Sequence, residues 1–166
     1  MRDTRLRIRP FIAADQEAAR RTILDGLGAH FGFIDETRNP DIDDILTHYI
    51  ASGQTFIVAE MDGQVIGTGA LLSEGGQTGR IVRMSVVREL RRKGIALALM
   101  ARLVQIARER GFRRLVLETN IGWDDAIGFY QHCGFREYEQ TDGLTHLALD
   151  LEAAHFGKER DQQMRS

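Results

Sequence analysis

Apolar residues along the chain follow two periods, one typical of strands and one typical of helices. Seven segments carry alternating or continuous apolar runs with strand character, at 6–9, 55–61, 64–72, 79–87, 115–119, 137–140 and 144–151. Apolar residues recur at helical spacing from 14 to about 26, after Asn39-Pro40, from 95 to 110 and from 123 to 133. Because strands and helices are mixed along one chain of 166 residues, the pattern predicts a single-domain α/β fold.

Two Asp-Gly pairs predict antiparallel hairpins. Asp62-Gly63 separates the second and third strand segments, and Asp142-Gly143 separates the last two. Asp-Gly is a strong hairpin signal because type I′ turns need positive φ at both central residues. With the strand at 79–87 following, the first hairpin predicts an antiparallel meander.

The segment that begins at Asn39 is expected to form a helix that ends at Gly53. Asn39 would cap it, and Pro40 suits the first helical position, where no N–H is needed. The apolar face would consist of Ile42, Ile45, Leu46 and Tyr49. The acids Asp41, Asp43 and Asp44 would complement the helix N-terminus, and the alternative is a negative rim of a pocket that binds an amine.

The strand at 115–119 is reached through the helix at 95–110, so it should lie parallel to the strand at 79–87 by a right-handed crossover. Ligands favour the carboxyl ends of such strands. There the chain carries a basic, glycine-containing turn, Arg91-Arg92-Lys93-Gly94-Ile95-Ala96. A helix start offers unpaired N–H groups and the positive end of the macrodipole, so this turn can cradle a phosphate. The alternative interpretation is a solvated charge run.

Arg91, Gly94 and Ala96 also match a family motif that reads Gln or Arg, two free positions, Gly, one free position, then Gly or Ala. A second match runs from 125 to 135 and contains Tyr130, three residues, then Gly134-Phe135. With these motifs in this order and spacing, the chain resembles the GCN5-related N-acetyltransferase (GNAT) superfamily.

This resemblance implies a GNAT-like fold, in which a mostly antiparallel sheet contains a central, splayed parallel strand pair and is flanked by helices. The domain is expected to cover residues 1–152, and residues 153–166 are expected to form a polar tail. The implied co-substrate is acetyl-CoA, with its pyrophosphate on residues 91–96 and its pantetheine arm beside Met84, Ser85 and Val86. Asn120 is expected to supply a contact that many relatives make from the position of Trp123.

The resemblance also implies catalytic roles. Tyr130 stands where relatives carry the acid that protonates the departing sulfur; the alternative is a core aromatic. Arg80 occupies the position of a glutamate base in some relatives, and an arginine cannot serve as a base. Glu118 is the replacement candidate, with an arginine partner as the alternative role. Asp124 and Asp125 rank behind Glu118 as candidates for the base, and the alternative is that they are helix-start charges.

The implied activity is direct transfer of an acetyl group, in a ternary complex, to a primary amine of a small molecule or amino acid. Two alternatives stay open: acetylation of a protein amino terminus or lysine, and a noncatalytic CoA-binding sensor. The acceptor pocket would include residues 30–36, although Phe31 and Phe33 could instead pack a core. Cys133 is interpreted as a small buried residue rather than a nucleophile.

Composition limits the binding partners, metal sites and cellular compartments that we expect for this protein. With 22 basic and 24 acidic residues, no global field favours nucleic acid or an anionic membrane. The five histidines show no metal-ligand spacing, so no metal site is expected. One cysteine, no signal-peptide pattern and no long apolar run favour a cytoplasmic protein. Exposed edge strands are compatible with a homodimer.

Overall fold

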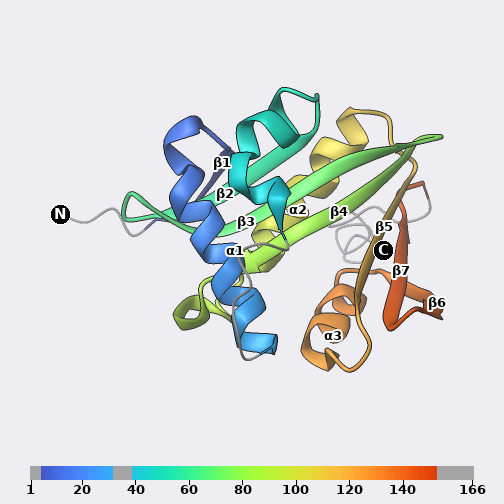
Figure 1. Ribbon diagram of the computed structural model, residues 1–166. Coiled ribbons are helices and arrows are strands. Elements are labelled where there is room, and N and C mark those ends of the chain that lie inside the picture. Colours follow the sequence, from blue (N-terminus) through green and yellow to red (C-terminus); the bar gives the residue numbers. More distant parts are fainter. Residues whose placement is uncertain (1–4, 32–38, 153–166) are drawn as a thin grey trace, which may run out of the picture. The chain divides into compact units, whose positions relative to one another are not determined.

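The computed structural model describes residues 5–31 and 39–152 (Figure 1). Its elements, in chain order, are β1 (Arg7–Pro10), η1 (Ala13–Asp15), α1 (Gln16–Phe31), η2 (Pro40–Asp44), η3 (Leu46–Ile50), β2 (Thr55–Met61), β3 (Gln64–Gly75), β4 (Thr78–Val86), η4 (Arg88–Leu90), α2 (Ile95–Glu109), β5 (Arg114–Asn120), α3 (Asp124–His132), β6 (Arg136–Thr141) and β7 (Leu144–Asp150). All seven predicted strands and both predicted Asp-Gly turns are present.

The strands form one seven-stranded sheet in the order β1-β2-β3-β4-β5-β7-β6. Strand pairing is antiparallel between β1 and β2, β2 and β3, β5 and β7, and β6 and β7. The pair β4–β5 is parallel, and its ladder joins Thr78–Arg80 to Arg114–Val116. The expected mixed sheet, mostly antiparallel with one parallel pair, is therefore confirmed.

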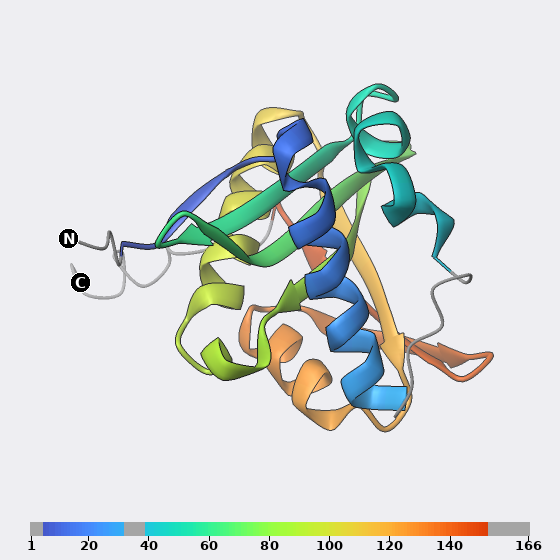
Figure 2. The same cartoon turned by 60° about the vertical axis from the view of Figure 1, so that its left-hand side comes forward.

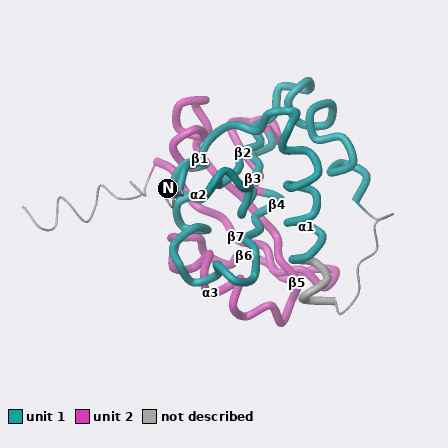
Figure 3. Tube along the Cα trace, turned by 90° about the vertical axis from the view of Figure 1, so that its left-hand side faces the viewer, with its two compact units in different colours: residues 1–72, 82–103 teal, residues 73–81, 104–166 magenta. Residues whose placement is uncertain are grey.

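The chain divides into two compact units (Figure 3). The first unit comprises residues 1–72 and 82–103, and the second comprises residues 73–81 and 104–166. The chain passes between the units within β3, within β4 and within α2, so each of these three elements contributes residues to both units.

In the first unit, helices cover both faces of the strands. Figures 1 and 2 show α1 on one face and the beginning of α2 on the other. The α1 face is filled by one apolar cluster that includes Ile23, Leu24, Ile45, Phe56 and Val58. On the opposite face, a Cβ added to Gly67 would lie 3.0 Å from a methyl carbon of Leu99 in α2. A Cβ added to Gly69 would lie 3.0 Å from a methyl carbon of Leu103 in the same helix. Glycine there lets the helix pack close to the strand.

In the second unit, β5 and β7 form the longest ladder. Leu115 and Leu117 of β5 stand opposite Leu149 and Leu147 of β7, and all four side chains are buried. Every residue of β6 is exposed. Strand β6 is therefore a polar edge strand of the kind that discourages uncontrolled edge pairing.

The predicted helix from Asn39 to Gly53 is wrong in type, because the chain forms a 3-10 turn at η2 and a single π turn at η3. Pro40 does begin the first turn, but Asn39 makes no side-chain cap. The reason lies in Gln16 of α1. Its amide NH₂ donates to the Ile42 carbonyl, and its amide oxygen accepts from the Ile45 N–H. These are backbone groups that a regular α-helix would have bonded internally.

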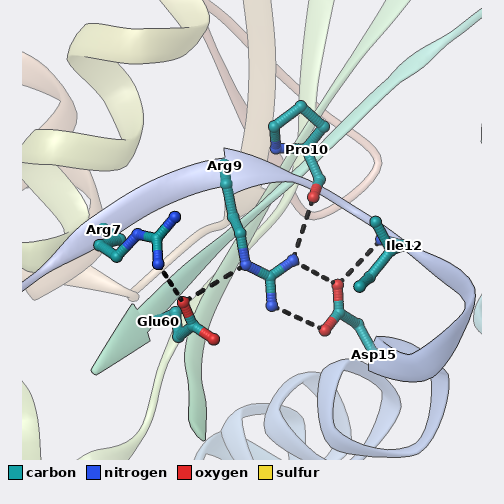
Figure 4. Close-up of polar contacts among 6 residues, drawn as sticks. All are labelled: Arg7, Arg9, Pro10, Ile12, Asp15 and Glu60. Atoms are coloured by element: carbon teal, nitrogen blue, oxygen red, sulfur yellow. Dashed lines mark hydrogen bonds and ion pairs between the residues drawn. The ribbon is translucent and has the colours of Figure 1, made fainter. Parts of the chain in front are cut away.

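A cluster of charged side chains holds the first strand (Figure 4). Arg9 donates two hydrogen bonds to the Asp15 carboxylate, at 2.8 and 2.9 Å. Asp15 also accepts from the Ile12 N–H at 2.9 Å, and Glu60 lies 3.5 Å from the Arg9 Nε. Burial alone would raise the pKa of Asp15, but the hydrogen bonds from Arg9 and Ile12 lower it below its ordinary value.

We expect Asp15→Asn to destabilise the protein by about 2–3 kcal/mol at neutral pH, because a buried charged acceptor is lost. Since the pKa of Asp15 is lower in the folded state, its stabilisation is present above the unfolded pKa, about 3.9, and disappears as the pH falls through the folded value. Urea unfolding of both proteins from pH 7 to pH 2.5 measures this. A difference between them that stays constant down to pH 2.5 would contradict the assignment.

Candidate functional site

The strongest sequence motif forms the expected strand, loop and helix in the first unit. Strand β4 ends at Val86, the short turn η4 follows, and α2 begins at Ile95. Arg91, Arg92, Lys93 and Gly94 lie between them and are all exposed. Three adjacent cations therefore face solvent at the start of a helix.

The loop backbone turns through two left-handed residues. Arg92 has φ +66° and Gly94 has φ +80°. A Cβ added to Gly94 would meet no atom within 4 Å, so glycine is needed there for its φ and not for space. Successive N–H groups in such turns can converge on an anion.

The first turn of α2 supplies backbone donors. The first bond into the helix runs from the Ala98 N–H to the Gly94 carbonyl at 3.0 Å. The N–H groups of Ile95, Ala96 and Leu97 therefore precede the intrahelical ladder. The Ile95 side chain is buried, so only its backbone can contribute to a binding site. This arrangement suits a phosphate or pyrophosphate.

The end of β4 is tied to its neighbours. The Ser85 hydroxyl donates to the Thr22 carbonyl of α1 at 3.0 Å, and the Arg91 Nε donates to the Val86 carbonyl at 3.3 Å. A Cβ on Gly26 would lie 2.8 Å from the Ser85 Oγ, so the glycine lets α1 approach this strand. The Ser85 side chain and the Val86 carbonyl thus have structural partners, and the other backbone groups of Met84–Val86 are what this segment could offer a ligand.

In the second unit, Tyr130 lies on α3 among other rings. Its ring centroid is 5.3 Å from that of Phe129 and 6.1 Å from that of Phe135. Burial first, and then the neighbouring Cys133, raise the pKa of Tyr130 to about 12. Some of the side chain stays exposed, and no buried side-chain polar atom in the described residues lacks a partner. Tyr130 is therefore protonated at every physiological pH.

The Gly-Phe pair of the second motif has a clear local role. Gly134 has φ +102° and donates to the Gln131 carbonyl, and the Phe135 N–H donates to the Tyr130 carbonyl at 3.0 Å. These bonds end α3 and place Phe135 against Tyr130. Burial raises the pKa of the Cys133 thiol to about 11, which disfavours the nucleophilic thiolate.

Glu118 lies on β5 in contact with an arginine. Its carboxylate pairs with the Arg80 guanidinium, and Arg80 also pairs with Glu74. Arg80 thus bridges two carboxylates in this chain. The arginine partner considered for Glu118 is present.

His146 is a residue that sequence reasoning missed. It stands opposite Glu118 in the β5–β7 register, with its Nδ1 3.8 Å from the Glu118 carboxylate. Its Nε2 lies 2.9 Å from the Thr141 hydroxyl. The Asp142-Gly143 turn was visible in the sequence, but the register that joins His146 to Glu118 was not.

The remaining residues singled out in the sequence lie at the end of β5, in the first turn of α3 or outside the described residues. Asn120 ends β5, and its carbonyl accepts from the Trp123 N–H at 3.2 Å. Asp124 and Asp125 lie in the first turn of α3, as expected of helix-start charges. Of the proposed acceptor segment, residues 32–36 lie outside the described part of the chain.

Within residues 5–31 and 39–152, no group of three His, Cys, Asp or Glu side chains is placed to hold a metal ion. No helix in those ranges is both long enough and apolar enough to cross a membrane.

Comparison with known proteins identifies the family. The family model described as "Acetyltransferase (GNAT) family" matches residues 21–135, which contain both motifs and β2 to α3. The chain therefore belongs to the GNAT acetyltransferase family, and the expected enzyme class, an N-acetyltransferase, is confirmed.

Several relatives are identical to this chain at about a third of the aligned positions. One is 32% identical over 72% of this chain and 72% of its own length: the uncharacterized N-acetyltransferase YjgM of Escherichia coli K12. N-acetyltransferase 8 of Rattus norvegicus is 34% identical over 75% of this chain, and N-acetyltransferase 8B of Homo sapiens is 33% identical over the same share. The matched region spans 59% and 58% of those two proteins.

Solved structures show the same fold. A GNAT-family acetyltransferase from Staphylococcus aureus Mu50 superposes with a TM-score of 0.81 at 22% identity, over 89% of this chain and 99% of that one. The PaiA N-acetyltransferase of Thermoplasma acidophilum, solved in complex with coenzyme A, superposes with a TM-score of 0.78 at 15% identity, over 88% and 99% of the two chains.

Proposed function

We propose that this chain transfers the acetyl group of acetyl-CoA directly to a primary amine of a small molecule or amino acid, within a ternary complex. The observation that carries the proposal is the exposed cationic loop before α2, in a chain of the GNAT family. Left-handed residues at 92 and 94 and the amides of 95–97 suit the pyrophosphate of a CoA ester. The related fold of PaiA holds coenzyme A.

Acetyl-CoA would supply the activated thioester, and a nitrogen–carbon bond would form as the carbon–sulfur bond breaks. The ammonium form of the acceptor would lose one proton before it attacks and a second from its nitrogen as the tetrahedral intermediate collapses, and the CoA thiolate would take up one proton. A lysine-like amine with a pKa near 10.4 is about 0.1% or less in its nucleophilic form at pH 7, so a base is required. Glu118 is proposed for this role, directly or through a water molecule. Its contacts with Arg80 and His146 would fix the direction of its carboxylate.

The departing sulfur of CoA also needs a proton or a hydrogen-bond donor, because it leaves as a thiolate. With its pKa raised to about 12, Tyr130 keeps its proton and can donate it in a hydrogen bond to the developing thiolate. Because a thiol, at a pKa of about 8.5, is the stronger acid of the two, Tyr130 would share its proton with the sulfur rather than lose it completely. That role needs only a positioned hydroxyl.

The proposed function is tested by measuring thiol release from acetyl-CoA in separate pools of amino acids, polyamines, aminosugars and lysine peptides, beside a control without acceptor. Release above the control with a small-molecule pool supports the proposal. Release with peptides alone would favour a protein acetyltransferase. Acetyl-CoA binding without release in any pool would favour a CoA-binding sensor.

We expect Tyr130→Phe to lower kcat by about tenfold or more while the Kd of acetyl-CoA changes little, because the lost hydroxyl acts in the transition state. Steady-state kinetics and calorimetric binding measure the two quantities. Tyr138→Phe, at an exposed position of β6, is the matched control and should leave both values unchanged. An unchanged kcat in Tyr130→Phe would remove Tyr130 from this role.

Glu118 and Glu74 offer a matched pair of variants, since both carboxylates contact Arg80. We expect Glu118→Gln to lower kcat/KM by about a hundredfold at pH 7, with a smaller deficit near pH 10, where the amine loses its proton unaided. Glu74→Gln should stay close to wild type. If the two variants lose equal activity, Glu118 acts through its ion pair and not as a base.

A further inference from the structure

One residue within β4 has a backbone conformation that side chains with a Cβ rarely adopt. Arg83 has φ +57°, in the left-handed region, although it lies inside the strand Thr78–Val86. In the described residues, the other non-glycine residues with positive φ are Asp62, Gln77, Arg92 and Asp142, and each lies in a turn or loop between elements. A left-handed arginine inside a strand requires that its surroundings hold it there.

The side chain of Arg83 is held by a carboxylate from a distant segment. Its Nε donates to Asp41 Oδ2 at 2.9 Å, and its Nη2 donates to Asp41 Oδ1 at 2.5 Å. The Tyr49 hydroxyl donates to the same Asp41 Oδ2 at 2.5 Å. Asp41 and Tyr49 belong to η2 and η3, so the contact joins β4 to the irregular helical turns of the first unit.

The backbone of Arg83 is held as well. Its carbonyl accepts a hydrogen bond from the Thr68 hydroxyl of β3 at 2.7 Å, and Thr68 is fully buried. The residue is thus fixed by a two-point contact at its side chain and by one contact at its carbonyl.

The unusual φ changes which way the following residues point. In a regular strand, successive side chains alternate between the two faces. Val82 packs against the apolar cluster of α1 and η2, yet Arg83 also reaches η2. Met84 then lies beside Gly69 and Leu103 on the α2 face, and Ser85 bonds to Thr22 of α1. The strand has therefore shifted phase by one residue just before Met84–Val86.

We propose that Arg83 and Asp41 form a lock that sets the position of the Met84–Val86 backbone for acetyl-CoA. The inference rests on the proposed function and on the expectation, from the family resemblance, that the pantetheine arm of acetyl-CoA lies beside Met84, Ser85 and Val86. Both are positioning residues: they hold the conformation of the strand and need not touch the co-substrate. Without the lock, Arg83 would relax toward an ordinary strand φ and turn the next peptide groups away.

The charges of the lock persist at physiological pH. Burial alone would raise the pKa of Asp41, but the hydrogen bonds from Arg83 and Tyr49 lower it below its ordinary value. Burial and the contact with Asp41 raise the pKa of Tyr49, so its hydroxyl stays a donor.

Glycine and alanine at position 83 separate the side-chain contact from the backbone conformation. Both variants lose the guanidinium, but glycine adopts a left-handed φ at little cost and alanine does not. We expect Arg83→Ala to bind acetyl-CoA about tenfold more weakly than wild type, and Arg83→Gly to stay within about twofold. Titration calorimetry with acetyl-CoA gives the Kd, and thermal unfolding of each variant confirms that it is folded.

A second pair of variants tests Asp41 even if Arg83→Ala does not fold. Asp43 lies on the same turn and pairs with Arg20 at 3.0 Å on the surface, so Asp43→Asn is the matched control. Asp41→Asn should weaken acetyl-CoA binding, Asp43→Asn should not, and adding Arg83→Gly to Asp41→Asn should restore the affinity. Restoration by glycine is not expected if the pair serves only stability.

The outcomes distinguish this inference from the function on which it rests. If the wild-type protein does not bind acetyl-CoA, the proposed function fails. If the wild type binds, but Arg83→Ala and Arg83→Gly have equal affinity, the lock alone is rejected. Equal affinities of Asp41→Asn and Asp43→Asn would reject it as well.

Discussion

The hydrogen bonds of strand β4 are the constraint on which the candidate binding segments, Met84–Val86 and the cationic loop before α2, depend. Its first residues, Thr78–Arg80, complete the parallel ladder with β5, and its end is bonded to β3 through the Val87 N–H and the Ile66 carbonyl. Between these two parts the strand departs from regular geometry at Arg83. The loop before α2 starts from that end, so the contact between Val87 and Ile66 also holds the point where the cationic loop begins.

Ion pairing decides which charges can serve a ligand. Arg9 is matched to Asp15, Arg80 to two glutamates, and Arg83 to Asp41. These arginines act as scaffold, because a guanidinium already bonded to carboxylates has few directions left for another acceptor. The cations at 91–93 are exposed instead, at the start of a helix. A chain with a net charge of −2 thus keeps a local positive site.

In the segment that forms η2 and η3, tertiary contacts override the local sequence signals for an α-helix. Pro40 and the spacing of Ile42, Ile45 and Tyr49 favour a helix, and their side chains are buried as that pattern predicts. The Gln16 amide competes for the backbone groups, so the segment keeps its apolar face but not α-helical hydrogen bonding. In this form Asp41 accepts hydrogen bonds from both Tyr49 and Arg83.

The sequence alone determined the elements whose signals are local. Asp-Gly turns, strand periodicity, the amphipathic α2 and the two GNAT motifs were sufficient for the mixed sheet, the crossover and the positions of the loop and Tyr130. The tertiary structure alone decided which charged side chains meet. Glu118 faces His146 because of the β5–β7 register, and Arg83 meets Asp41 across 42 positions of sequence through a left-handed φ. Register and individual φ angles result from packing the whole chain, and no local pattern of residue types encodes them.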